Sequence, residues 1–580
     1  MPKNFIERPR KNEKDDAIQY VKSLLTQARE DNRNEDIEKL EELVRLLHTK
    51  KYGLVWEEHA EIVEEEMKTK IPVFVEDAGR KIVGNPDSED YNFLLEGDNL
   101  HSLHLLEKTQ SGKIDVIYID PPYNTGNKDF IYNDKIVDKT DGYSHSKWLS
   151  FMSKRLEIAR NLLSDKGVIF ISIDDNEFSQ LKLLCDDIFG EHNKLITLHT
   201  QVRYSDKTLN EKNDWQPVLE YVLVYSRDKT KFKANKPEEE YSIDKFIFEF
   251  QEISEGTEFF VNGRKVTVFK KGEWKSIKHR TPAENLLKET WVSGSIYSGT
   301  GNGTMVQNVI EPRIHLDGVG SLYKIDGLGE DGLGYRYFVG PSKEGATRSK
   351  MYSGIPISRN EELSKGTAKK YKSIPNYFDF SADFGNIRHE GKVAFNSGKK
   401  PIKMLKQLIN YHTFKNGIVL DFFAGSGSTG HAVAQLNKED GGNRKYILCT
   451  NNENKIAEEV TYKRLSNIQY DLPHNLKYFK TDFVDKAEFP DFTLETELLK
   501  YITPLVEIEF GIDISNPSVQ IILTEEHLEA LLQNHELQAG ATLFIHPDVF
   551  LESKEQEQLS ELQITLQEIP DYFFGKELWS

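Results

Sequence analysis

The sequence is poor in cysteine and has no long hydrophobic runs. Its 580 residues include only two cysteines, Cys185 and Cys449, which lie far apart in the chain. Two such residues supply neither a disulfide framework nor a cysteine-rich zinc site, so we expect no metal and a reducing, cytoplasmic setting. No run of 18 or more apolar residues is present, and residues 1–16 have no apolar core. We therefore expect neither a membrane-spanning helix nor a signal peptide.

Length and charge indicate several domains with different surfaces. A chain of 580 residues exceeds what one hydrophobic core usually supports. The net charge of −19 is unevenly distributed: residues 481–580 contain 21 acidic and 4 basic residues, whereas residues 341–410 contain 14 basic and 6 acidic residues. A basic segment of this kind is the expected footprint of contacts with nucleic-acid phosphates, and it is also typical of an ordinary solvated surface.

One short stretch, Asp120-Pro121-Pro122-Tyr123, follows a predicted buried strand at residues 116–119. The β-branched apolar run before it has the composition of a strand in a parallel sheet. The two prolines lack an N–H group and have a restricted φ, so the chain leaves the sheet in a rigid conformation. In open α/β sheets, ligands bind at the carboxyl ends of the strands. We therefore expect a binding site at Asp120.

The residue types in this stretch suit the activation of an exocyclic amino group on a nucleobase. The lone pair of such an amine is delocalised into the ring, and acceptors for its two hydrogens free that lone pair. An ionised Asp120 is purely an acceptor, and the Pro121 carbonyl is a second one. Tyr123 offers a face on which a flipped base can stack. A simple Pro-Pro turn with an aspartate at a strand end explains the four residues equally well.

A second motif lies about three hundred residues further along the chain. Residues 418–423 form another buried-strand pattern, and Gly425, Gly427 and Gly430 then give the spacing G-x-G-x-x-G before a predicted helix. Strand, glycine turn and helix in this order predict a site for a nucleoside-like cofactor, whose anionic group can face the helix N-terminus. A dinucleotide is the competing ligand, but the acid that it needs after the next strand comes late, at Glu453.

The two motifs together resemble those of the DNA amino-methyltransferases that depend on S-adenosylmethionine. DPPY precedes FAGSG (residues 423–427), which is similar to the β-class order. The flanking stretches LLEGDNLHSLHLL and WLSFMSKRLEIARNLLSDKGVIFISIDDNE more narrowly resemble the modification (Mod) subunit of type III restriction–modification systems. This resemblance covers most of residues 40–480. It implies an α/β, Rossmann-like methyltransferase sheet with a circularly permuted motif order.

The resemblance also implies roles for individual residues. Asp120, Pro121, Pro122 and Tyr123 are the expected catalytic residues. The expected contacts of S-adenosylmethionine are Asp98, Lys400, Pro401, Asp421, Phe423, Ala424, Gly425, Ser426, Gly427 and Glu453. A helix N-cap is the alternative role for Asp98. In the motif that precedes the glycine strand, only Lys400 and Pro401 match the family wording His-Pro-Thr-Gln-Lys-Pro, and Asn396 and Ser397 occupy its turn.

Five segments follow from the resemblance and from changes in pattern. They are a helical N-terminal region (1–85), a catalytic half of the methyltransferase domain (86–195), an α+β target-recognition domain (196–393), a cofactor-binding half (394–480) and a small acidic C-terminal domain (481–580). The glycine-rich stretch 298–304 mimics a nucleotide loop, but no strand precedes it and no apolar helix follows it. We interpret it as a loop without a nucleotide.

The expected function is site-specific methylation of adenine N6 in double-stranded DNA, with flipping of the target base. The expected partners are DNA, a second copy of the chain and a helicase–nuclease restriction subunit. The chain has no G-x-x-x-x-G-K-[ST] loop, so ATP-driven cleavage would come from that subunit. Three alternatives stay open: methylation of cytosine N4, methylation of RNA or protein, and a role chiefly as the sequence-reading subunit of a nuclease.

Overall fold

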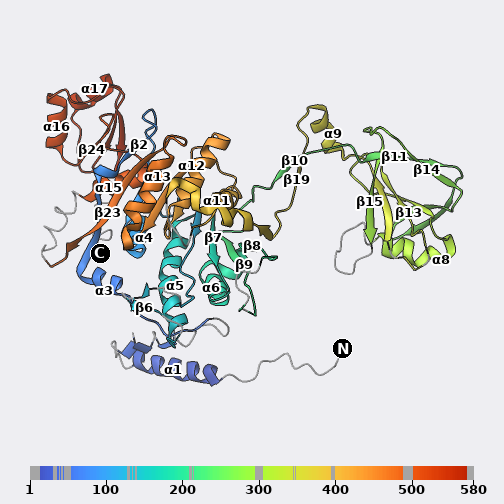
Figure 1. The fold of residues 1–580 in the computed structure, drawn as a ribbon, viewed down its shortest axis with the longest axis horizontal. Coiled ribbons are helices and arrows are strands. Elements are labelled where there is room, and N and C mark those ends of the chain that lie inside the picture. The colour runs from blue at the N-terminus through green and yellow to red at the C-terminus, as the bar shows by residue number, and fades with distance from the viewer. Residues whose placement is uncertain are drawn as a thin grey trace. The chain divides into compact units, whose positions relative to one another are not determined.

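The computed structural model divides the chain into two compact units: a main unit (1–235 and 375–580) and an inserted unit (236–374). Figure 1 shows the elements of both units. The structure describes residues 13–30, 36–37, 39–40, 43–44, 54–126, 131–132, 135–137, 140–207, 212, 214–293, 305–343, 345–346, 348–393, 399–487 and 501–570.

An 11-stranded sheet organises the described part of the main unit. Its strands, in spatial order, are β1 (Lys70–Glu76), β23 (Asn475–Asp485), β3 (Asn92–Glu96), β22 (Lys445–Thr450), β21 (Ile418–Asp421), β4 (Ile114–Ile119), β7 (Leu163–Ile173), β9 (Leu219–Ser226), β8 (Lys194–Gln201) and β20 (Tyr377–Asp379), and β2 (Ile82–Val83) pairs with β23. The six strands from β23 to β7 are parallel to their neighbours, whereas β1 and β9 join this block in the antiparallel sense. The predicted α/β sheet is therefore confirmed as a mixed sheet.

The direction in which the chain moves through this sheet reverses between β21 and β4. From β21 the chain continues into β22 on one side, and from β4 it continues into β7 on the other. A reversal of this kind opens a crevice at the carboxyl ends of the two strands. Both predicted motifs follow these two strands, so the topology alone places them at the crevice.

Helices cover both faces of the parallel block. The helices α4 (Asn99–Gln110) and α5 (Ser144–Leu162) make the crossovers from β3 to β4 and from β4 to β7, whereas α12 (Ser428–Asp440) makes the crossover from β21 to β22 in the opposite direction. Right-handed crossovers of opposite direction place their helices on opposite faces. The strands between them are buried on both sides, and their apolar side chains are close to fully buried.

Shorter helices complete the main unit around the sheet. They are α3 (Ile62–Thr69), η1 (Ala78–Arg80), α6 (Phe178–Cys185), η2 (Asp186–Gly190), η3 (Glu191–Asn193), α10 (Ser381–Asn386), η6 (Ile387–Lys392), α11 (Ile402–Ile409), η7 (Glu453–Lys455), η8 (Ile456–Tyr462) and α13 (Lys463–Ile468). A two-stranded ribbon, β5 (Ile131–Tyr132) with β6 (Lys135–Ile136), lies in the segment that follows Tyr123. Cys185 and Cys449 are both buried free thiols.

The two ends of the chain have different structures. Near the N-terminus, α1 (Glu13–Glu30) and α3 agree with the predicted helical region, but residues 70–83 include β1 and β2, which belong to the central sheet. After α15 (Ile502–Phe510), the C-terminal segment forms a parallel sheet of β24 (Val519–Ile522), β25 (Thr542–Ile545) and β26 (Thr565–Glu568), connected by α16 (Glu525–Gln533) and α17 (Ser553–Glu561). No helix in the described residues is long and apolar enough to cross a membrane.

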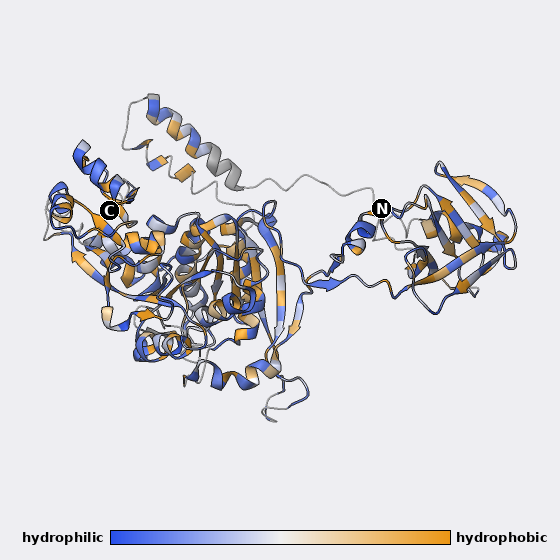
Figure 2. Cartoon of the chain, turned by 90° about the horizontal axis from the view of Figure 1, so that it is seen from above, coloured by the Kyte–Doolittle hydropathy of each residue, from blue (hydrophilic) through white to orange (hydrophobic). Residues whose placement is uncertain are grey.

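The inserted unit has its own eight-stranded antiparallel sheet. Its order is β12 (Thr257–Val261), β13 (Arg264–Phe269), β16 (Leu322–Asp326), β17 (Tyr335–Val339), β18 (Arg348–Ser353), β15 (Leu287–Ser293), β11 (Phe246–Glu252) and β14 (Trp274–Lys278). A ribbon of β10 (Glu238–Glu240) and β19 (Lys369–Tyr371), with η4 (Val306–Ile310), η5 (Glu311–Arg313), α8 (Ile314–Asp317) and α9 (Ile357–Ser364), completes it. Figure 2 shows hydrophobic and hydrophilic residues alternating along several of its strands, the pattern of a sheet with two different faces.

The inserted unit is shorter than the segment predicted from the sequence. It begins at Lys236 rather than at residue 196 and ends at Ile374 rather than at residue 393. The reason is strand pairing, because β8, β9 and β20 extend the central sheet beyond β7. Residues 298–304, interpreted above as a loop without a nucleotide, lie outside the described residues.

Candidate active site

The two predicted motifs meet at one edge of the central sheet. β4 and β21 are adjacent and parallel, with Val116 paired to Val419. Asp120 follows the last residue of β4, and the glycine turn follows the last residue of β21. The charge of Asp120 contributes to a raised pKa of Asp421, about 7, although burial of Asp421 is the larger cause. The acid and the glycine turn, separated by about 300 residues in sequence, are therefore neighbours.

The turn at Asp120 is held by α5 and by its own side chains. Trp148 of α5 is fully buried and donates from Nε1 to the carbonyl of Pro122 at 2.7 Å. The hydroxyl of Tyr123 lies 2.9 Å from Asp120 Oδ1. Asn124 follows with a φ of 57°, in the left-handed region, and donates from Nδ2 to Glu177 at 2.6 Å. The conformation of the stretch is thus set by one contact inside the motif, from Tyr123 to Asp120, and by contacts with Trp148 and Glu177 outside it.

Two residues outside the motif complete the surroundings of Asp120. Lys400, just before α11, has its Nζ 3.2 Å from Asp120 Oδ1, 2.7 Å from the Tyr123 hydroxyl and 2.8 Å from Glu220 Oε2. Glu220 lies on β9 and also accepts from the Tyr123 hydroxyl at 3.0 Å. Residues from three distant segments therefore form one hydrogen-bonded group.

The charges in this group oppose one another. Burial raises the pKa of Asp120, the ammonium of Lys400 lowers it and the carboxylate of Glu220 raises it again, with a net upward shift. The two carboxylates raise the pKa of Lys400 in spite of its burial, so Lys400 is charged at neutral pH. A partly buried aspartate that lies between an ammonium and a second carboxylate is typical of a functional site.

The side chain of Asp421 fixes the conformation of the glycine turn through hydrogen bonds. The carboxylate of Asp421 accepts from the backbone N–H of Phe423 at 3.0 Å and from the Thr429 hydroxyl at 2.5 Å. It therefore joins the end of β21 to the first turn of α12. Gly425 and Gly427 have φ angles of 47° and 73°, a region that favours glycine. Gly427 is also the N-cap residue of α12.

The backbone at Gly425 leaves room for a ligand, whereas at Gly430, in the first turn of α12, there is no free space. A side chain added at Gly425 would meet only the Phe423 carbonyl oxygen, at 3.7 Å, so this side of the backbone is open. At Gly430, an added Cβ would lie 3.0 Å from Leu448 and Leu465, so the absence of a side chain lets α12 pack closely on the sheet. Both features fit a nucleoside-like cofactor bound at the turn.

Two residues that the sequence did not indicate support this turn. The hydroxyl of Thr461, on η8, donates to the carbonyl of Gly425, and the guanidinium of Arg464, on α13, donates to the hydroxyl of Ser428. Both are fully buried. The helical spacing of Thr461 and Arg464 was the signal available in the sequence, but spacing does not reveal that both side chains are buried.

The remaining predicted cofactor residues differ in how close they come to the turn. Ala424 donates its N–H to the Cys449 carbonyl at 3.1 Å, and Ser426 is buried with its hydroxyl 3.1 Å from that of Ser428. Phe423 packs against Phe151. Pro401 is the N-cap residue of α11, and Glu453 is exposed beyond the end of β22. Asn396 and Ser397 lie outside the described residues.

Asp98 has the alternative role considered above, and it also belongs to a buried network. Its Oδ1 accepts from the N–H of Leu100, as an N-cap does, and lies 3.2 Å from Arg155 of α5. Arg155 also donates to Asn99 and to both oxygens of Glu61. Asn99 in turn donates to the Phe422 carbonyl at 2.7 Å. Arg155 thus connects the N-terminal segment to the strand that carries the glycine turn.

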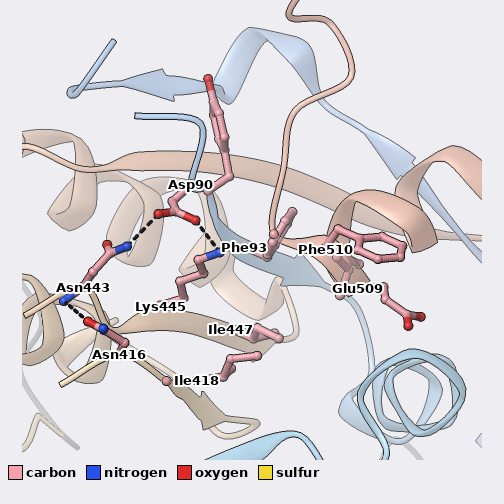
Figure 3. Close-up of a pocket in the computed structure, with 13 residues that line it drawn as sticks. Asp90, Phe93, Asn416, Ile418, Asn443, Lys445, Ile447, Glu509 and Phe510 are labelled. Atoms are coloured by element: carbon pink, nitrogen blue, oxygen red, sulfur yellow. Dashed lines mark hydrogen bonds and ion pairs between the residues drawn. The ribbon is translucent and has the colours of Figure 1, made fainter. Parts of the chain in front are cut away.

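The cavity shown in Figure 3 is separate from this site. Its volume is about 340 Å³, and residues at the amino ends of β3, β21 and β22 line it together with the end of α15. Asp90 and Lys445 form an ion pair of 2.5 Å on its wall. Because Asp120 and the glycine turn follow the carboxyl ends of parallel strands, this cavity lies at the opposite edge of the sheet.

The basic segment 341–410 is not one continuous patch of free charge. Its residues are divided between the two units, and several pair with carboxylates, including Lys350 with Glu289 and Lys403 with Asp383. Lys399 and Lys400 are buried. The count of charges in the sequence therefore overstated the cationic surface available to phosphates.

Comparison with known proteins gives matches to DNA methylases. Residues 114–461 match a family model described as DNA methylase. The Mod subunit of the type III restriction–modification enzyme StyLTI from Salmonella typhimurium (strain LT2) is 33% identical over 415 residues, which cover 66% of this chain and 56% of that protein. The type II methyltransferase M.KpnI from Klebsiella pneumoniae is 32% identical over 404 residues, 67% of this chain and 88% of that protein.

The extent of these matches differs between the relatives. This chain spans little more than half the length of the StyLTI Mod subunit but most of M.KpnI. Among solved structures, the PvuII DNA methyltransferase (cytosine-N4-specific) overlaps with a TM-score of 0.31 and 10% identity, over 73% of this chain and 94% of that one. A score this low supports no argument about function.

Proposed function

Because this chain belongs to the DNA methylase family, we propose that it transfers a methyl group from S-adenosylmethionine to N6 of adenine in double-stranded DNA. The observation that carries the proposal is the adjacency of β4 and β21, which brings an acceptor for an amine beside a turn suited to a nucleoside. The open side of Gly425 and the N-terminus of α12 are where the cofactor would lie.

The residues at Asp120 have distinct roles in this reaction. Within the described residues, the two polar contacts of Asp120, with Tyr123 and Lys400, both use Oδ1, so Oδ2 can accept a hydrogen from the target amine. The Pro122 carbonyl already accepts from Trp148, which leaves the Pro121 carbonyl as the second acceptor. The ring of Tyr123 provides the stacking surface for the flipped base, a contact of roughly 1–3 kcal/mol.

Catalysis in this proposal comes from alignment and from polarisation of the nucleophile. When bound, S-adenosylmethionine supplies an electrophilic methyl group on sulfur. Asp120 and Pro121 draw the amine hydrogens toward themselves, so the nitrogen lone pair points along the direction of attack. The amine loses one proton in the overall reaction, and Asp120 is the nearest base.

The target base is tested by sequencing modified bases in DNA from cells that express this chain. We expect N6-methyladenine at a single recognition sequence and no methylation with the Asp120→Ala variant. Aspartate rather than serine at the first motif position resembles the adenine enzymes, which is our reason for this choice. N4-methylcytosine in the same experiment would favour the cytosine alternative, and methylated RNA or protein without methylated DNA would contradict the proposal.

The wider role that we propose is that of a type III Mod subunit, with a restriction subunit as partner. The similarity to the StyLTI Mod subunit supports it. A second candidate, a methyltransferase that acts without a partner, has support in the 88% coverage of M.KpnI. Co-expression with a type III restriction subunit, followed by purification through a tag on this chain, distinguishes the two. A stable complex favours the first role, and methylation without association favours the second.

We propose that the inserted unit recognises DNA and that the C-terminal segment mediates assembly. Exposed Trp291, beside Lys350, supports the first assignment. β26 pairs with β25 alone in the described sheet, and its four residues are all exposed, which supports the second assignment because an edge strand can accept another chain. A homodimer is the expected assembly, and native mass spectrometry of the purified chain measures it. The circularly permuted motif order belongs to the same proposal, with Lys236 and Ile374 as the bounds of the inserted unit.

A further inference from the structure

Lys400 and Glu220 form an ion pair that the transfer of a methyl group does not by itself require. The pair lies inside the site: the side chain of Lys400 is 7% exposed and that of Glu220 is 19% exposed. Lys400 comes from the turn before α11 and Glu220 from β9, 180 residues apart in the chain. Removing two charges from water is costly, and their attraction offsets that cost only where the geometry is good and further hydrogen bonds satisfy both groups.

The ammonium of Lys400 makes full use of its hydrogens. It has three, and three acceptors lie within 3.2 Å: Glu220 Oε2, the Tyr123 hydroxyl and Asp120 Oδ1. Its position therefore depends on Glu220 as much as on Asp120. Lys400 was predicted from the family resemblance to contact the cofactor, but its ammonium lies against the acceptor for the target amine.

We propose that Lys400 and Glu220 act as a positioning pair: Lys400 favours the ionised form of Asp120 and contacts its Oδ1, so that Oδ2 is presented to the target amine, and Glu220 holds the Lys400 ammonium in place. This inference rests on the proposed function, because it assigns the pair a role only through Asp120. Neither residue is a catalytic group in this account. Both act on the group that touches the substrate.

The physical reason is that Asp120 must accept hydrogens and not donate one. A protonated carboxyl would present an O–H group to the amine. Burial favours that protonated form, and the Lys400 ammonium opposes it. Glu220 holds the ammonium in place, but its own charge favours protonation of Asp120. The two members of the pair should therefore shift the titration of Asp120 in opposite directions.

Other ionisable groups near Asp120 are few. Tyr123 and Tyr118 both have pKa values raised well above the usual range by burial, so they stay neutral through the working pH range. Among the described residues, Asp421 is a further neighbour of Asp120, and burial together with the charge of Asp120 raises its pKa to about 7. Asp174 is a neighbour of Glu220, and burial raises its pKa. Both are common to all the variants described next, so they cannot produce opposite shifts among them.

The test is the pH dependence of methyl transfer by the full-length chain, from pH 5 to 9, on DNA that contains the recognition sequence. Lys400→Met should raise the midpoint of the acidic limb by about one pH unit, because a cation beside the carboxylate is lost. Glu220→Gln should lower that midpoint, because a negative charge near Asp120 is lost while the Gln side-chain oxygen can still accept a hydrogen bond from Lys400. Lys400→Arg should keep the midpoint near that of the unsubstituted protein, and the double variant Lys400→Met/Glu220→Gln should return toward it.

The outcomes separate this inference from the proposed function. If the unsubstituted protein methylates DNA but both single variants lower the rate without moving the midpoint, or move it in the same direction, the pair is only structural and the inference is wrong. If the unsubstituted protein methylates no DNA, the proposed function fails and the pair's role fails with it. Thermal unfolding and binding of S-adenosylmethionine check that each variant folds; should Lys400→Met not fold, the nearly isosteric Glu220→Gln decides alone.

Discussion

The central sheet and the sheet of the inserted unit place their polar and aromatic residues differently. In the parallel block of the central sheet, chemically useful residues follow the strands, and the strands themselves are buried on both faces. In the antiparallel inserted sheet, they lie along the strands: Trp291 on β15 is 61% exposed and Phe260 on β12 is 71% exposed. Parallel strands gather their ends at one edge and build a point-like site, whereas an antiparallel sheet offers an extended surface.

Substitutions in the two units should therefore have separate effects. A change in the central sheet should affect chemistry or folding of the main unit, and a change on the inserted sheet should affect DNA affinity. The cores are separate as well, since the apolar clusters of the inserted unit contain residues of that unit alone. The variants described next test whether substitutions in the two units have separate effects.

The largest expected effect comes from Asp120→Ala. Loss of the acceptor for the target amine should lower the rate of methyl transfer by about 10²–10³-fold, the scale seen when a preorganised polar group is removed from a reacting centre. Binding of S-adenosylmethionine, measured by calorimetry, should stay close to that of the unsubstituted protein. Asp244→Ala, at an exposed aspartate of the inserted unit, is the matched control and should keep full activity. Robust activity of Asp120→Ala would contradict the assignment.

The next effect concerns stability. Lys477 of β23 is buried and pairs with Glu507 of α15 and, at 2.9 Å, with Asp513. Lys477→Met leaves Glu507 buried without its cation, which should cost about 3–5 kcal/mol in the free energy of unfolding. Differential scanning calorimetry should show this loss in the transition of the main unit only.

The inserted unit supplies the control for that experiment. Lys324 pairs with Glu252 at 2.9 Å, but both side chains are about one-third exposed. Lys324→Met should therefore cost no more than about 1 kcal/mol, in the transition of the inserted unit. A shift of both transitions by either variant would show that the units do not unfold separately.

A third prediction concerns the stability of the main unit at low pH. Burial raises the pKa of Asp513, but hydrogen bonds from Lys477 and Lys81 outweigh burial and lower it well below its usual value. A carboxyl with a lowered folded-state pKa stabilises the protein above its unfolded-state pKa, near 4, and this contribution is lost as the pH falls below that value. The thermal midpoint of the main unit should therefore fall steeply below about pH 4. Asp513→Asn should be less stable at pH 7 and should show a flatter dependence on pH.

The smallest expected effects lie on the inserted sheet. The Nζ of Lys350 lies 4.9 Å from the centre of the Trp291 ring. If this pair contacts DNA, Lys350→Ala should weaken binding at every sequence and reduce the slope of log K against log salt by about one. Trp291→Ala should lower affinity by roughly 1–3 kcal/mol. Fluorescence anisotropy at several salt concentrations measures both. Unchanged DNA binding by both variants would place the DNA surface elsewhere.

Local features of the fold were predictable from the sequence. The buried strands predicted at 116–119 and 418–423 overlap β4 and β21, and the helix predicted after the glycine turn is α12. These predictions succeed because side-chain periodicity and glycine or proline punctuation act within a few residues. The boundaries of the inserted unit were less accurate, because β8 and β9 join the central sheet through pairing that no local pattern reveals.

The sequence by itself determined which chemistry this protein carries: an acid and two prolines after one strand, and a glycine turn after another. Only the tertiary structure decided that these strands are neighbours, and that Lys400 and Glu220 surround Asp120. The hydrogen bond from Lys400 to Tyr123 joins residues 277 positions apart. A contact of that range depends on strand order and on the burial of charge, and neither property is encoded in the residues next to it.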